Sequence, residues 1–186
     1  MLGHLFVEEG YSTTVRADRM EHVMRFFEPK AELNVVLAAY VSEFVGKLMD
    51  VHYYEVSKYL LGSPQKLNWL VQHMYDASVC KSILMPLIFK PERDIDLETS
   101  VLEKKLEREQ IDKTLHPLRV KLLKDVWARV LSSQDAELTT NVLQMFRDAV
   151  RRSSGEERFK SFLHETLYSQ QTVDGLFKFL LNTDVS

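Results

Sequence analysis

The stretch that most constrains the fold runs from Leu33 to Met49 and is the most apolar segment of the chain. Its length corresponds to about four to five turns of helix. Apolar residues recur in it at spacings of three and four, the pattern of one buried helix face: Leu33, Leu37, Tyr40, Val41, Phe44 and Leu48. Val36, Ala39 and Val45 widen this face. We therefore expect a helix that other helices cover on several sides.

Helical periodicity continues along the rest of the chain. Six glycines and five prolines in 186 residues disfavour an all-β fold, which needs many turns. We expect helices over residues 17–27, 31–49, 54–61, 64–74, 77–88, 101–113, 117–130, 136–152, 156–168 and 173–181. Helices paired in series favour an all-α, armadillo/HEAT-like helical repeat (α-solenoid) of about nine or ten helices. A compact helical bundle is the structural alternative.

The chain is expected to form a single domain over residues 1–186, with a polar connector near 90–100 that is rich in acidic residues. Two positions inside predicted helices need an explanation. Pro86 should kink or shorten its helix, because proline cannot donate a backbone hydrogen bond. Gly46 costs about 1 kcal/mol relative to alanine in a helix, so we expect another helix to approach closely there.

Charge and cysteine content exclude several classes of protein. The net charge of −3 argues against a general binder of nucleic acid or of membrane surfaces. The lone Cys80 cannot form an internal disulfide. The first ten residues contain acidic residues and lack the basic residues that flank a targeting peptide. No run reaches the ~18 apolar residues of a membrane span. We predict an intracellular, cytoplasmic protein.

The sequence offers no convincing catalytic or metal-binding motif. His164-Glu165 begins like a zinc-protease motif, but Tyr168 stands where the second histidine ligand must be. Cys80 lies near His73, but we expect it to be a buried structural thiol. We therefore predict a protein that is not an enzyme and needs no cofactor or metal. An enzyme or small-ligand protein that uses Cys80, His73 or His164 is the less favoured alternative.

A loose group of cations and an aromatic-rich segment suggest where a protein partner binds. The exposed sides of two predicted helices, over residues 53–61 and 119–129, are the candidate surface. Its residues are Tyr53, Lys58, Arg119, Lys121, Lys124 and Arg129. A plain solvated face is the simpler explanation of the cations.

A family resemblance passes through the apolar stretch. It is carried by Phe26-Phe27-Glu28-Pro29, Leu33-Asn34, Leu37-Ala38, Tyr40, Ser42, Gly46 and Leu48, and then by Val56, Leu60, Leu70-Val71 and His73. Residues 25–89 resemble the SAPS-domain family, the regulatory subunits of protein phosphatase six-type enzymes. The chain departs from the family pattern at Lys30-Ala31 and Val35, where prolines are usual, and at 74–78, where a Gly-Thr-Ser turn is typical.

The resemblance implies a helical-repeat adaptor without activity of its own. Its partner would be a serine/threonine phosphatase catalytic subunit, which it would place near substrates. A structural subunit of a large multiprotein assembly, one that retains the helical-repeat core, is the alternative function.

Overall fold

The computed structural model describes residues 13–30, 33–89 and 101–152. Within these ranges the chain forms helices joined by turns and contains no β-strand, which confirms the all-α prediction. The helices expected at 156–168 and 173–181, and the polar connector at 90–100, lie outside the described residues.

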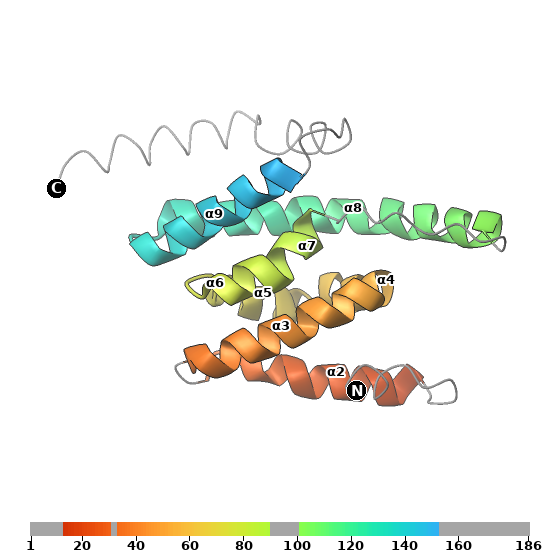
Figure 1. The fold of residues 1–186 in the computed structure, drawn as a ribbon, viewed down its shortest axis with the longest axis horizontal. Coiled ribbons are helices and arrows are strands. Elements are labelled where there is room, and N and C mark those ends of the chain that lie inside the picture. The colour runs from red at the N-terminus through yellow and green to blue at the C-terminus, as the bar shows by residue number, and fades with distance from the viewer. Residues whose placement is uncertain (1–12, 31–32, 90–100, 153–186) are drawn as a thin grey trace.

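The helices stack in three layers. They are α2 (Thr13–Met24), the 3-10 helix η1 (Arg25–Phe27), α3 (Val35–Val51), α4 (Tyr53–Leu61), α5 (Pro64–Gln72), α6 (Ala77–Val79), the π-helix η2 (Cys80–Leu84), α7 (Met85–Ile88), α8 (Val101–Ser132) and α9 (Ala136–Arg152). In Figure 1, α2 and α3 lie at one edge, α8 and α9 lie at the other, and α5 to α7 lie between them. The middle layer therefore joins the two ends of the described chain.

Side chains that accept backbone hydrogen bonds determine where several helices begin. Asn34 Oδ1 accepts from the N–H of Leu37 at 3.1 Å, at the start of α3. Asp76 Oδ1 accepts from the N–H of Ser78 at 2.8 Å, at the start of α6. Asp135 Oδ1 likewise accepts backbone hydrogen bonds at the start of α9. Each cap satisfies an amide that has no partner within its own helix.

The predicted interruption at Pro86 takes the form of a π-helix directly before it. The N–H of Met85 bonds to the carbonyl of Cys80, five residues back. Because Pro86 has no N–H, the helical ladder loses one backbone hydrogen bond at this point. The wider turn of η2 absorbs the defect, and the chain continues as α7.

The predicted break at His116-Pro117 is wrong, because α8 runs without interruption for 32 residues with Pro117 inside it. Proline removes the hydrogen bond that would reach the carbonyl of Lys113. Lys113 and Pro117 are both exposed. Water can therefore hydrate the carbonyl that loses its partner, and the helix tolerates the proline.

The buried side of α3 agrees only in part with the one that periodicity predicted, because Val45 and Leu48 are buried as expected but other residues of the predicted face are not. Ala38, Ser42 and Val45 are fully buried, whereas Leu37 is 51% exposed and Tyr40 is 69% exposed. A covering of α3 on several sides is therefore not what the structure shows. The small residues face η2, α4 and α6, against which α3 packs. They allow a close approach that larger side chains would prevent.

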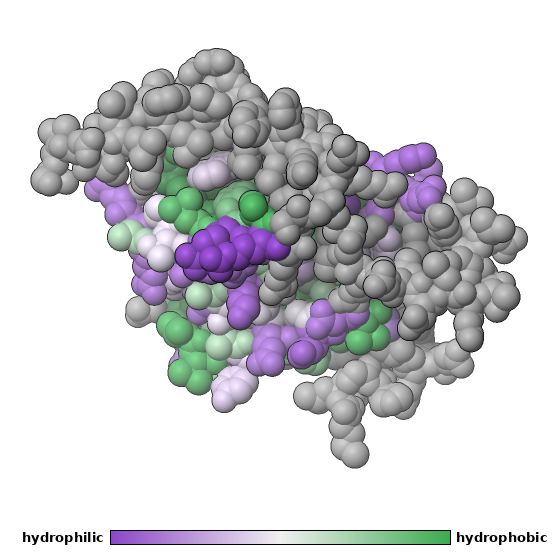
Figure 2. Space-filling model, turned by 45° about the horizontal axis from the view of Figure 1, so that its top comes forward, coloured by the Kyte–Doolittle hydropathy of each residue, from purple (hydrophilic) through white to green (hydrophobic). Residues whose placement is uncertain are grey.

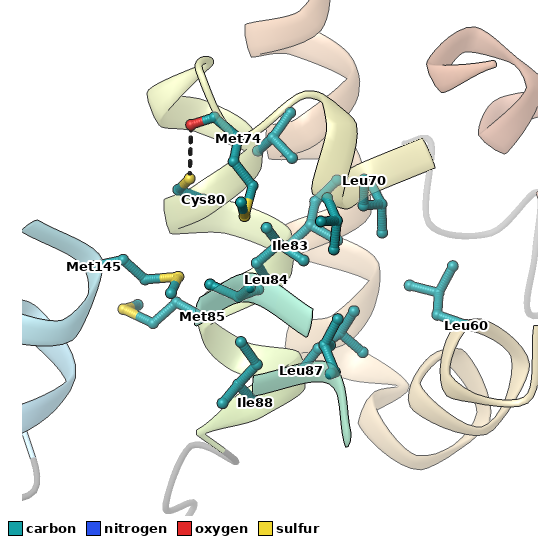
Figure 3. Close-up of a cluster of buried hydrophobic side chains, with 14 of the residues drawn as sticks. Leu60, Leu70, Met74, Cys80, Ile83, Leu84, Met85, Leu87, Ile88 and Met145 are labelled. Carbon is teal, nitrogen blue, oxygen red and sulfur yellow. Dashed lines mark hydrogen bonds between the residues drawn. The ribbon is translucent and has the colours of Figure 1, made fainter. Parts of the chain in front are cut away.

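The most deeply buried cluster gathers around η2 and α7. Figure 3 shows Ile83, Leu84 and Leu87 from these segments among side chains of the neighbouring helices, including Leu60 and Leu70. All five are fully buried. This cluster, and not α3, is the centre of the core.

Candidate functional site

The structure separates the six residues of the predicted partner surface into two groups. Lys58, Lys121, Lys124 and Arg129 are exposed. Tyr53 and Arg119 are each only 6% exposed. These two residues therefore do not lie on an accessible surface, because each finds its partners inside the fold.

Tyr53 and Arg119 belong to one polar network between α4 and α8. Arg119 Nη2 donates to Asp112 Oδ1 at 3.2 Å and to the hydroxyl of Tyr53 at 3.3 Å. Tyr53 in turn donates to the carbonyl of Pro86 at 3.0 Å, and Tyr54 donates to Asp112 Oδ2 at 3.3 Å. A buried guanidinium requires such compensation, since an unpaired buried charge is costly. The network holds helices together and presents no free group to a partner.

A second polar cluster connects α2 to α4 and α5. Glu21 Oε2 accepts from Lys66 Nζ and from the hydroxyl of Tyr59, each at 2.8 Å. The bond from Lys66 lowers the pKa of Glu21, and burial together with Glu21 raises the pKa of Tyr59. Sequence patterns do not reveal this cluster, because its members lie on three separate helices and share no local pattern.

Cys80 and His73 do not form a nucleophile–base pair. The Cys80 thiol donates to the carbonyl of Met74 at 3.2 Å, and burial raises its pKa to about 12 (Figure 3). His73 uses Nε2 on the carbonyl of Phe27 and Nδ1 on the hydroxyl of Tyr75, at 3.0 and 3.1 Å. Burial lowers the pKa of His73. A reactive cysteine needs a lowered pKa and an adjacent base, and this thiol has neither.

The described part of the chain contains neither a metal-binding cluster nor a membrane-spanning helix. There, no group of three or more His, Cys, Asp or Glu side chains is placed to hold a metal ion. Among the described helices, none combines the length and the apolar character needed to cross a bilayer. His164 lies outside the described residues.

The most unusual surface feature is the outer side of α3. We define the outer face of α3 as Val36, Leu37, Tyr40 and Val51, which are 66%, 51%, 69% and 73% exposed. Glu43 and Lys47 lie between them and are also exposed. Single exposed apolar residues are common, but several large ones on one helix are typical of an interaction surface. Figure 2 shows apolar side chains in separate patches between polar ones on the face that it draws.

Helical periodicity predicts that most of this face is buried in the core, whereas it is exposed. One signal could have revealed the true orientation. Ala38, Ser42 and Gly46 recur every four residues and therefore share a side of the helix. A side made of small residues favours close packing, which leaves the large residues outside.

Comparison with known proteins adds no assignment: no family model matches this chain, and no match was found among the curated proteins or the solved structures.

Proposed function

We propose that this chain is a non-catalytic adaptor or regulatory scaffold that binds other protein chains. The observation that carries the proposal is the outer face of α3, where Val36, Leu37 and Tyr40 are exposed on consecutive turns. Burying a side chain of this kind is worth about 1.5–3 kcal/mol. A protein partner that covers this face gains that free energy.

An adaptor joins two chains and therefore needs a second surface. The exposed cations Lys58, Lys121, Lys124 and Arg129 are the candidates for it. Lys121 and Lys124 are three residues apart on α8 and share a side of the helix. Charged groups of this kind contribute more to specificity and to the rate of association than to affinity.

The resemblance to SAPS domains supports a more specific form of this proposal. In that form the fold is an armadillo/HEAT-like repeat inside the cell, and the partner of the second surface is a serine/threonine phosphatase catalytic subunit. The adaptor acts by placing the phosphatase near its substrates.

Quantitative affinity purification of the full chain from its own cells tests the proposal. Tyr40→Asp should lose a partner of the α3 surface, and the double variant Lys121→Glu/Lys124→Glu should lose a partner of the α8 surface. Each variant is the control for the other, and both should melt at the wild-type temperature because the changed residues are exposed.

Three results would revise the proposal in different ways. Recovery of all partners by both variants contradicts it. Recovery of partners without a phosphatase removes only the phosphatase form. Co-purification with many proteins at fixed stoichiometry indicates the alternative function, a structural subunit of a large assembly.

A further inference from the structure

The outer face of α3 carries one acidic and one basic residue between its apolar residues. Glu43 and Lys47 are one helical turn apart and both are exposed. Lys47 also lies 4.0 Å from Asp50, with the side chains 72% and 60% exposed. An ion pair this exposed contributes little to stability, so it does not prevent Lys47 from pairing elsewhere.

The positions on this face have the spacing of a helix–helix seam. Val36, Tyr40, Glu43, Lys47 and Val51 are separated by four, three, four and four residues. Spacings of three and four residues keep side chains on the side of a helix that faces a second helix crossing at about 20°. The face therefore fits one helix lying along α3.

From this arrangement we infer that the outer face of α3 pairs with the same face of a second copy of this chain, in antiparallel orientation. The inference rests on the proposed function, because it names the chain that covers the same face. A two-fold axis at the level of Val45 places Glu43 of each copy opposite Lys47 of the other. Because the contact is reciprocal, Glu43 and Lys47 form two ion pairs across the interface.

The same register also matches the apolar residues. Tyr40 of each copy comes to the level of residues 50 and 51 of the other, where Val51 is exposed. A parallel pair would instead set Glu43 against Glu43 and Lys47 against Lys47, and like charges opposite each other are destabilising. Charge complementarity therefore selects the antiparallel arrangement.

The size of the contact predicts how strong the dimer is. α3 has 17 residues and is about 25 Å long, so a single helix pair buries less than the ~800 Å² per partner of a standard interface. The dimer should therefore dissociate on dilution. In Figure 1, α8 lies at the opposite edge from α2 and α3, so pairing through α3 leaves the cations of α8 open to another partner.

Sedimentation velocity of the full chain over a range of concentrations tests the inference. The wild type should form a concentration-dependent dimer. Glu43→Lys and Lys47→Glu should each weaken the dimer at least tenfold, because each creates two contacts between like charges. An equimolar mixture of the two variants should restore it, since the introduced lysine then faces the introduced glutamate. The double variant Glu43→Lys/Lys47→Glu should dimerise by itself.

Asp125→Lys is the matched control, because Asp125 is exposed on α8, which lies at the opposite edge from α3 in Figure 1, and its reversal should leave the dimer unchanged. A wild type that stays monomeric at about 1 mM overturns the inference. A wild-type dimer that neither charge reversal weakens overturns the inference as well, because the two helices then pair in a different register. If the chain is monomeric but Tyr40→Asp still loses a partner from cells, the face binds a different protein and the proposed function stands.

Discussion

Gly46 lies where α3 packs against η2. A Cβ atom added at Gly46 would lie 3.1 Å from the carbonyl oxygen of Ser82 and 3.3 Å from its Cβ. A larger side chain would have to move the backbone of η2, and overpacking typically costs about 1–3 kcal/mol. Because leucine also gains about 1 kcal/mol of helix propensity, Gly46→Leu should lower the free energy of unfolding by up to about 2 kcal/mol, measured by urea denaturation.

Whether Gly46→Leu lowers or raises the free energy of unfolding decides whether η2 lies close to Gly46. Leucine favours a helix over glycine by about 1 kcal/mol, so the same substitution would stabilise the protein if space were available. Val51→Leu is the control, because Val51 is on the same helix and 73% exposed. A Gly46→Leu variant as stable as the wild type would contradict the close approach of the two segments.

The Cys80 thiol should be inert in the folded protein. It is 1% exposed, and burial raises its pKa to about 12. The thiolate is the reactive form, so at pH 8 both protonation and burial oppose reaction. We expect a disulfide reagent such as DTNB to label Cys80 only after unfolding in urea. Complete labelling of the native protein within seconds would show that the segment opens.

At the scale of the elements, the contact between α4 and α8 depends on polar groups as well as apolar ones. Arg119 is buried on α8, and its partners are Tyr53 at the start of α4 and Asp112 one to two turns earlier on α8. Arg119→Met would leave Asp112 and the Tyr53 hydroxyl without this donor. Breaking a fully buried pair costs about 3–5 kcal/mol, but the Asp112 side chain is 26% exposed, which reduces the loss.

We therefore expect Arg119→Met to lower the free energy of unfolding by about 2 kcal/mol. Tyr53→Phe should cost about 1 kcal/mol, because the carbonyl of Pro86 loses its donor. The double variant should lose less than the sum, since the two residues share a hydrogen bond. Lys121→Met, an exposed change on the same helix, should stay within 0.5 kcal/mol of wild type. If the double variant loses as much stability in chemical denaturation as the two single variants together, the coupling between the two residues is refuted.

Local signals predicted where helices lie better than which side of a helix is buried. The helix starts expected at residues 64 and 77 are confirmed, because they depend on neighbours in the sequence: Pro64 begins α5 and the Asp76 side chain caps α6. The prediction of the buried side of α3 was wrong for Leu37 and Tyr40, because hydrophobic periodicity does not take account of the small residues that allow η2 to approach. Arg119 was placed on the surface for a similar reason: its partner Tyr53 is distant in sequence and no local pattern reveals it.

At the scale of the whole molecule, His73 connects segments from both ends of the described chain. Its Nε2 lies 3.0 Å from the carbonyl of Phe27 in η1, and its Nδ1 lies 3.1 Å from the hydroxyl of Tyr75. Asn141 of α9 donates to the carbonyl of Tyr75 at 2.7 Å. The carbonyl requires a proton on Nε2, so the neutral ring accepts from Tyr75 through Nδ1.

Protonation of His73 should therefore weaken the whole fold. Burial lowers the pKa of His73 below its ordinary value of 6.5, although the nearby Asp76 carboxylate opposes the shift. A base whose pKa is lower in the folded state than in the unfolded state keeps its full contribution to stability above pH 6.5. That contribution is lost as the pH falls from 6.5 through the folded-state pKa, with a slope of at most about 1.4 kcal/mol per pH unit.

Urea denaturation at several pH values between 7.5 and 5 isolates this contribution when wild type is compared with His73→Gln. Glutamine can keep a donor near the carbonyl of Phe27 but does not titrate. The stability difference between the two proteins should therefore shrink as the pH falls below 6.5. His22→Gln is the matched control, because His22 is exposed on α2 and its replacement should leave the pH dependence of wild type unchanged. If wild type and His73→Gln lose stability in parallel, His73 does not supply the pH dependence, and other groups must carry it.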